Sequence, residues 1–117
     1  RMGTDWFLQK NHDTFAPLGP FIVPKEFVED PHALKQTLML SGALMQDSYT
    51  GNMTHDVYEM LSYLSNILTL TPWDIYARVS PSGVGTARET PIYMKAGDTA
   101  VCTIESIGTL TNPVAEL

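Results

Sequence analysis

Hydrophobic residues follow a strand-like alternation in one part of this chain of 117 residues. Leu34, Leu38 and Leu40 fall on one parity, as on one face of a strand. A Ser-Gly pair at 41–42 separates them from a second apolar run at 43–50. A short turn between two such runs favours a β-hairpin, and we predict one here.

A helical pattern follows the hairpin. Thr54 is a good N-cap residue, and Asp56 then lies in the first turn, where a carboxylate is favourable. The apolar residues recur at helical spacing: Val57, Met60, Leu61, Leu64, Ile67 and Leu68. Pro72 ends the pattern, because proline cannot continue a helix. We predict that this segment is the main helix.

The remaining apolar runs are short and separated by turns. Trp6–Leu8 is predicted as a strand, and the prolines of 10–24 predict an extended loop after it. The segments 74–80 and 99–107 are also predicted as strands, with a turn at 95–98 before the second. One helix among at least five strands predicts an α+β, β-rich fold.

Composition narrows the classes of partner. Asp and Glu number 13 against 7 Lys and Arg, which gives a formal net charge of -6. Because no basic stripe is present, we expect neither nucleic acid nor an anionic membrane as a partner. Apolar runs fall short of the roughly 18 residues of a membrane span, and we expect no secretory signal. The single Cys102 fits a reducing compartment.

The stretch SPSGVG at 80–85 is the first candidate for chemistry. A phosphate-binding P-loop needs Lys-Ser or Lys-Thr after its last glycine, at the start of a helix. Here Thr86 and Ala87 follow, and Pro91 soon prevents a helix, so nucleotide binding is disfavoured. The residues alone leave open a plain glycine turn and an active-site loop in which Ser80 contributes a hydroxyl.

Other candidates are weaker. Lys10 enters the proline-stiffened loop with Thr14 four residues later, although lysines are usually solvated surface residues. The three histidines stand alone, without a second ligand at metal-binding spacing, and are predicted to be surface or hydrogen-bonded residues. Cys102 lies in mid-strand and is predicted to be a core residue. We find no paired carboxylates for a hard metal ion.

Five stretches follow one another in the order and spacing typical of one protein family. They are WFLQK-NHDTFAPLGPFIVPKE, LMLSGALMQD, NMTHDVYEMLSYLSNILTLTPWDI, SPSGVG and KAGDTAVCTIESIGTLTNPV. Together they resemble the C-terminal part of the fumarylacetoacetate hydrolase family. The resemblance covers essentially the whole chain and implies that 1–117 is the later part of a single catalytic domain.

This resemblance implies a mixed, β-roll-like sheet core and a homodimer. It also implies Mg²⁺, Mn²⁺ or Ca²⁺ as cofactor, held by a Glu-x-Glu pair and a later Asp. No carboxylates of this sequence match those ligands, so we expect them upstream of this chain. Family members hydrolyse a C–C bond, decarboxylate or tautomerise small 2-oxo or 1,3-dioxo acids.

The resemblance also assigns roles to individual residues. Lys10 matches the lysine beside the metal that reaches the substrate's oxygen, and Thr14 matches a hydroxyl residue near the same site. Ser80 matches the hydroxyl residue of the loop that holds the substrate's acid end. The chain departs from the family at Arg78-Val79, where Thr-Gly is usual. Two readings of Arg78 stay open: it binds a second carboxylate, or it caps the entrance.

These inferences predict a cytoplasmic, metal-dependent enzyme that acts on a small oxo acid. Lys10 is the predicted catalytic residue, and Ser80, Thr14 and Arg78 are the predicted substrate-binding residues. We expect Lys10 and Ser80 to face one cavity although 70 positions separate them. The alternative is a catalytically inactive homologue or a structural fragment that only folds and dimerises.

Overall fold

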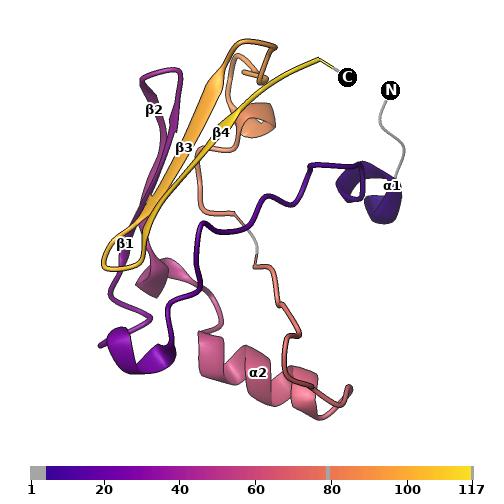
Figure 1. Cartoon of the computed structure of the whole chain (residues 1–117), viewed down its shortest axis with the longest axis vertical. Helices are drawn as coiled ribbons and strands as arrows, with labels where there is room; N and C mark the ends of the chain where they lie inside the picture. Colours follow the sequence, from indigo (N-terminus) through magenta and orange to yellow (C-terminus); the bar gives the residue numbers. More distant parts are fainter. Residues whose placement is uncertain (1–4, 79, 117) are drawn as a thin grey trace.

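The computed structural model describes residues 5–78 and 80–116. At its centre is a sheet of antiparallel strands in the order β2-β1-β3-β4 (Figure 1). The strands are β1 Lys35–Leu40, β2 Ala43–Tyr49, β3 Thr99–Ile104 and β4 Gly108–Pro113. The central β1–β3 pairing joins two hairpins that lie far apart in the sequence.

The hairpin predicted around Ser41–Gly42 is confirmed. Both turn residues have positive φ, 47° and 85°, which the favoured two-residue hairpin turn requires. β1 and β2 pair from Lys35 opposite Tyr49 to Leu40 opposite Ala43. The turn therefore sets the register that carries the β2 side chains to the functional site described below.

The turn predicted at 95–98 is confirmed, and the strand predicted over 99–107 is found as β3 but ends at Ile104. The N–H of Asp98 donates to the Lys95 carbonyl oxygen at 3.0 Å. The Ser41 hydroxyl donates to Asp98 Oδ1 at 2.6 Å, which links the two turns. The Lys95 N–H donates to Asp98 Oδ2 at 2.8 Å. The Ser41 bond, followed by the Lys95 N–H bond and the Lys95 charge, lowers the pKa of the Asp98 carboxyl below its usual value.

The main helix, α2, spans Val57–Ser65, and its predicted N-cap is wrong. The N-cap is Asp56, whose carboxylate accepts the Glu59 N–H at 2.7 Å. Glu59 Oε2 in turn accepts the Asp56 N–H at 3.1 Å. This capping box satisfies two helix-terminal donors at once, whereas the Thr54 hydroxyl alone satisfies only one.

The helix also ends earlier than its apolar spacing predicts. Asn66 is the C-cap, and its side-chain amide donates to the Ser62 carbonyl oxygen at 2.7 Å. The N–H groups of Ile67 and Leu68 both donate to the Leu64 carbonyl oxygen, at 2.9 and 2.8 Å. These two N–H groups share one carbonyl oxygen in a tight turn. This turn lies where the sequence predicts the last turn of the helix.

Residues Trp6–Lys10 form a short helix, α1, so the strand prediction for Trp6–Leu8 is wrong. Asp5 supplies the physical reason. Its carboxylate accepts the N–H groups of Phe7 at 2.8 Å and Leu8 at 3.3 Å, which caps the first turn. Three consecutive apolar residues carry no period that separates a strand from a helix.

The strand predicted over 74–80 is not found in the described part of that segment, and Val79 lies outside the described residues. Residues 75–78 form no backbone hydrogen bond with the sheet in the part of the chain described, and a strand needs such a partner. The other elements are short 3-10 helices: η1 Lys25–Phe27, η2 Thr50–Asn52 and η3 Gly85–Ala87.

The sheet of the described residues thus has four strands, not five or more, and all its pairings are antiparallel rather than mixed. The α+β, β-rich class is retained, with one main helix beside the sheet. The β-roll-like core that the resemblance implies stays a prediction.

Few side chains are buried. Within 5–78 and 80–116 only Leu34 and Ser48 are buried, while large apolar residues such as Trp6 and Ile22 are 72% and 77% exposed. Cys102 is exposed on β3, so the prediction of a core position is wrong. Neighbouring strand atoms still desolvate its sulfur in part, and this raises the pKa of the Cys102 thiol.

Candidate functional site

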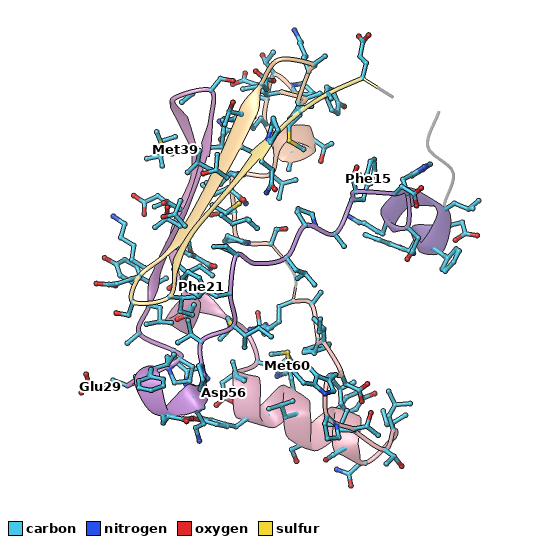
Figure 2. The ribbon with its side chains drawn as sticks, viewed as in Figure 1. Phe15, Phe21, Glu29, Met39, Asp56 and Met60 are labelled. Atoms are coloured by element: carbon cyan, nitrogen blue, oxygen red, sulfur yellow. The ribbon has the colours of Figure 1, made fainter. Side chains whose placement is uncertain are left out.

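An open cleft of about 1240 Å³ lies between the sheet, α2 and the residues Tyr76, Arg78 and 80–82. Figure 2 shows Met60 on the face of α2 that is turned towards the sheet, and this side chain lines the cleft. The lining residues are Gln36, Ser48, Tyr49, Asn52, Met53, Thr54, His55, Glu59, Met60, Ser62, Tyr63, Asn66, Tyr76, Arg78, Ser80, Pro81 and Ser82.

The wall of the cleft on the Ser80 side is fixed to the sheet by Gln46. The side-chain Nε2 of Gln46, on β2, donates to the Pro81 carbonyl oxygen at 2.8 Å. The same nitrogen donates to the Ser82 carbonyl oxygen at 3.2 Å. One strand side chain therefore holds the two residues that directly follow Ser80.

Arg88 provides a second attachment. Its Nη2 donates to the Met45 carbonyl oxygen at 2.6 Å, and its Nε donates to the Gly83 carbonyl oxygen at 3.3 Å. The guanidinium thus bridges β2 and the glycine loop. Sequence reasoning missed both Gln46 and Arg88. A polar residue inside an apolar hairpin strand was a usable signal for Gln46, whereas the sequence carries none for Arg88.

The glycines of the loop are required by close packing. Gly83 has φ of 97°, and a Cβ added there meets the Met45 carbonyl oxygen. A Cβ added at Gly85 meets the Ile92 carbonyl oxygen, and the Ile92 N–H donates to the Gly85 carbonyl oxygen at 3.1 Å. These contacts explain why glycine occupies both positions. The predicted approach of loop N–H groups to an anion stays a prediction.

Arg78 is half-buried in the wall of this cleft. Its Nε and Nη1 atoms are shielded from solvent and have no hydrogen-bond partner in the described chain. Among the described residues that line the cleft, Glu59 carries the only carboxylate. Glu59 Oε2 is already used at the start of α2, by the Asp56 N–H at 3.1 Å and by His55 Nδ1 at 3.5 Å.

A shielded cation without a counter-charge is unfavourable unless an anion binds beside it. The cleft therefore offers an uncompensated positive charge from Arg78 and a hydroxyl from Ser80, which is exposed in the same wall. This combination is suited to a small anionic ligand. A second cleft of about 290 Å³, lined mainly by apolar groups, lies on the other side of Ser80, against the sheet.

The structure brings together two of the four predicted site residues. Arg78 and Ser80 line the same cleft, but Lys10 and Thr14 are not among its described lining residues. Lys10 ends α1, with its ammonium 5.7 Å from the centre of a Trp6 ring. Figure 1 shows α1 apart from both the sheet and α2. The described chain does not bring Lys10 to the cleft of Ser80, and the roles of Lys10 and Thr14 stay predictions.

The described residues do not fit a metal centre by themselves. No group of three or more His, Cys, Asp or Glu side chains within 5–78 and 80–116 is placed to hold an ion. Instead, His32 Nε2 accepts the Val57 N–H at 3.1 Å, as predicted for a hydrogen-bonded histidine. Nor does any helix of the described chain have the length and apolarity to cross a membrane.

Comparison with known proteins gives consistent results. Residues 1–115 match the family model described as fumarylacetoacetate (FAA) hydrolase C-terminal. The mitochondrial oxaloacetate tautomerase FAHD2B of Bos taurus is 43% identical over 114 residues, which cover 97% of this chain and 36% of that protein. This chain thus spans little more than a third of the length of that relative.

Solved structures are similar in both fold and sequence. The 2-hydroxyhepta-2,4-diene-1,7-dioate isomerase from Mycobacterium marinum has a TM-score of 0.81 and 42% identity, covering 95% of this chain and 40% of that one. The maleylpyruvate hydrolase from Sphingobium sp. SYK-6, in complex with manganese(II) and pyruvate, has a TM-score of 0.79 and 33% identity. That match covers 89% of this chain and 37% of the hydrolase.

These relatives are named as a tautomerase, an isomerase and a hydrolase, so their reactions differ. One of them is solved with a divalent metal ion. The family model spans nearly the whole chain, in agreement with the order and spacing of the sequence motifs. The chain therefore belongs to the fumarylacetoacetate hydrolase family and matches its C-terminal region.

Proposed function

We propose that this chain is the C-terminal part of an enzyme that acts on small 2-oxo or 1,3-dioxo acids. The observation that carries the proposal is the shared cleft of Arg78 and Ser80, which combines a shielded, unpaired cation with a hydroxyl. The acid end of an oxo acid is a carboxylate, a small anion of the kind that a cation and a hydroxyl bind. Oxaloacetate is the first substrate to test, because a relative of 43% identity is named an oxaloacetate tautomerase.

In this proposal Ser80 binds the substrate's acid end, and Arg78 and Thr14 complete the substrate contacts. Gln46 and Arg88 hold the loop in place, so the hydroxyl of Ser80 is positioned before the substrate arrives. Tautomerisation moves a proton between carbon and oxygen, and negative charge builds on that oxygen in the transition state. We assign Lys10 to this charge, because an ammonium aimed at a developing oxyanion stabilises it.

The role assigned to Lys10 requires that α1 lies against the cleft in the full-length protein. A divalent ion such as Mg²⁺, Mn²⁺ or Ca²⁺ belongs to the proposal only as a group held by residues outside this chain, since the described residues do not fit one. We also propose a homodimer, in which some of the exposed apolar side chains become covered. A cytoplasmic location stays a prediction.

The test is a substrate panel on the full-length protein. It comprises the enol-to-keto conversion of oxaloacetate, its decarboxylation to pyruvate, and the hydrolysis of acylpyruvates. Each assay is run with Mg²⁺ or Mn²⁺ and again after chelation. We expect turnover of at least one oxo acid, lost on chelation and restored by the metal. If no oxo acid in the panel is turned over under any of these conditions, the protein is the non-catalytic homologue instead.

A further inference from the structure

We propose that Arg78 makes this site selective for oxo acids that carry a second carboxylate, by pairing with that carboxylate in the cleft. The inference rests on the proposed function, because it names the substrate class of the same site. It also decides between the two readings that the sequence leaves open for Arg78, a ligand for a second carboxylate and a cap on the entrance.

The burial of Arg78 argues against an entrance cap. A capping arginine at the rim keeps its guanidinium hydrated, at little energetic cost. Here Nε and Nη1 have lost their water without gaining an acceptor among the described residues. These two nitrogens are packed against protein atoms, as a hydrated rim residue would not be, and Nη2 is not among the shielded atoms. A ligand in the cleft can therefore meet the positive charge at Nη2. Because the residue is only half-buried and lines the cleft, part of the side chain remains within reach of that ligand.

The charges around Arg78 point to the same conclusion. The ion pairs of the described chain join His32 to Asp30, Lys35 to Asp47 and His55 to Glu59, and none includes Arg78. A carboxylate is a suitable partner for this charge, because hydrogen bonds between a guanidinium and a carboxylate are charge-assisted.

The site then has two separate groups for two anionic ends. Ser80 is assigned to the first acid end, and Arg78 carries the only permanently charged cation among the described residues that line the cleft. A monocarboxylate leaves the guanidinium unpaired, and sites discriminate strongly when a shielded polar group is left unpaired by the wrong ligand. The geometry therefore favours dicarboxylates over monocarboxylates.

The experiment compares fumarylpyruvate, which has two carboxylates, with acetylpyruvate, which has one, in the full-length protein. If one of these compounds is not turned over, it is added as an inhibitor to the oxaloacetate assay. Its inhibition constant is then compared in place of kcat/KM. The variants are Arg78→Met, which removes the charge, and Arg78→Lys, which keeps the charge but loses the fork. Lys95→Met is the matched control, because Lys95 lines neither cleft in the described chain.

We expect Arg78→Met to lower kcat/KM for the dicarboxylate by about 10- to 100-fold, the scale of one lost charge-assisted interaction. The monocarboxylate value should stay unchanged, Arg78→Lys should fall in between, and Lys95→Met should resemble the wild type. If Arg78→Met does not fold, Arg78→Lys decides the question. It should lower kcat/KM for the dicarboxylate and leave the value for the monocarboxylate unchanged.

Two outcomes overturn the inference while leaving the proposed function intact. An equal loss on both compounds shows that Arg78 pairs with a protein carboxylate or has a structural role. No loss on either compound shows that it is an entrance cap. A wild-type protein without activity on any oxo acid is a different result, because it removes the proposed function and this inference together.

Discussion

The side-chain amide of Gln46 donates to the Pro81 carbonyl oxygen at 2.8 Å, across 35 positions of sequence. The bond attaches the loop that begins at Ser80 to strand β2, near the middle of the first hairpin. The position of the proposed carboxylate-binding hydroxyl therefore depends on the register of the sheet as well as on the loop's own residues.

Replacing Gln46 tests this attachment. Gln46→Glu keeps the shape of the side chain but removes the N–H donors, and it places a carboxylate against two carbonyl oxygens. We expect KM for the best oxo acid to rise at least about 3- to 10-fold, the scale of a single lost hydrogen bond where two are removed, with a smaller change in kcat. Hydrogen exchange at 80–85 should become faster. Unchanged exchange and unchanged KM would show that the loop holds its conformation without Gln46.

The close packing of Gly83 leads to a prediction about stability. Gly83→Ala meets both an unfavourable positive φ and the Met45 carbonyl oxygen, so it should lower the free energy of unfolding by about 2–4 kcal/mol. Gly97→Ala is the matched control, since Gly97 also has positive φ, 89°, but its added Cβ meets nothing within 4 Å. Gly97→Ala should lower the free energy of unfolding by only about 1 kcal/mol. Equal losses in urea denaturation would contradict the packing argument.

The bond between Ser41 and Asp98 leads to a prediction about pH. The Ser41 hydroxyl is the largest cause of the lowered pKa of Asp98, so Ser41→Ala should move that pKa up towards the usual 3.8. A lowered pKa in the folded state stabilises the fold above the unfolded value, and this contribution is lost as the pH falls through the folded pKa. Carbon-13 NMR titration of the Asp98 carboxyl measures the shift. A pKa that does not move in the variant would assign the effect to Lys95 instead.

Lys10 and Ser80 are predicted to affect different kinetic constants in the full-length protein. Lys10→Met keeps the length of the side chain but removes the charge, and it should lower kcat by about 10²-fold or more. Ser80→Ala should mainly raise KM, because a carboxylate anchor is used equally in the ground and transition states. Steady-state kinetics on the best oxo acid measures both. A near-normal kcat in Lys10→Met would contradict the catalytic role. Lys10 would then be a solvated surface residue, and it is exposed in the described chain.

The sequence predicts best where two local signals agree. The Ser41–Gly42 turn and the strand from Thr99 were predictable because turn chemistry and alternation agree there. The helix limits were not, since a reciprocal capping pair outcompetes a single hydroxyl at Thr54. At α1 the Asp5 carboxylate caps a helix that begins with three apolar residues, and these carry no period of their own.

The candidate site was predictable only in part. Ser80 was found from the glycine loop that it precedes, and Arg78 was found as a departure from the Thr-Gly that is usual in the family. The attachment of that segment to β2 by Gln46 and Arg88 is a tertiary arrangement, and a single sequence does not reveal such partners. The exposure of Cys102 has a similar origin, because a strand pattern does not tell which faces of a sheet other residues cover.

The most direct test of the central claim is a crystal structure of the full-length protein with pyruvate and Mn²⁺. We predict that the pyruvate carboxylate lies within hydrogen-bond distance of the Ser80 hydroxyl, inside the cleft that Arg78 lines. In the same structure, the loop should remain attached to Gln46 through Pro81, as it is here. Pyruvate bound elsewhere, with Ser80 and Arg78 in contact only with protein groups, would contradict the account.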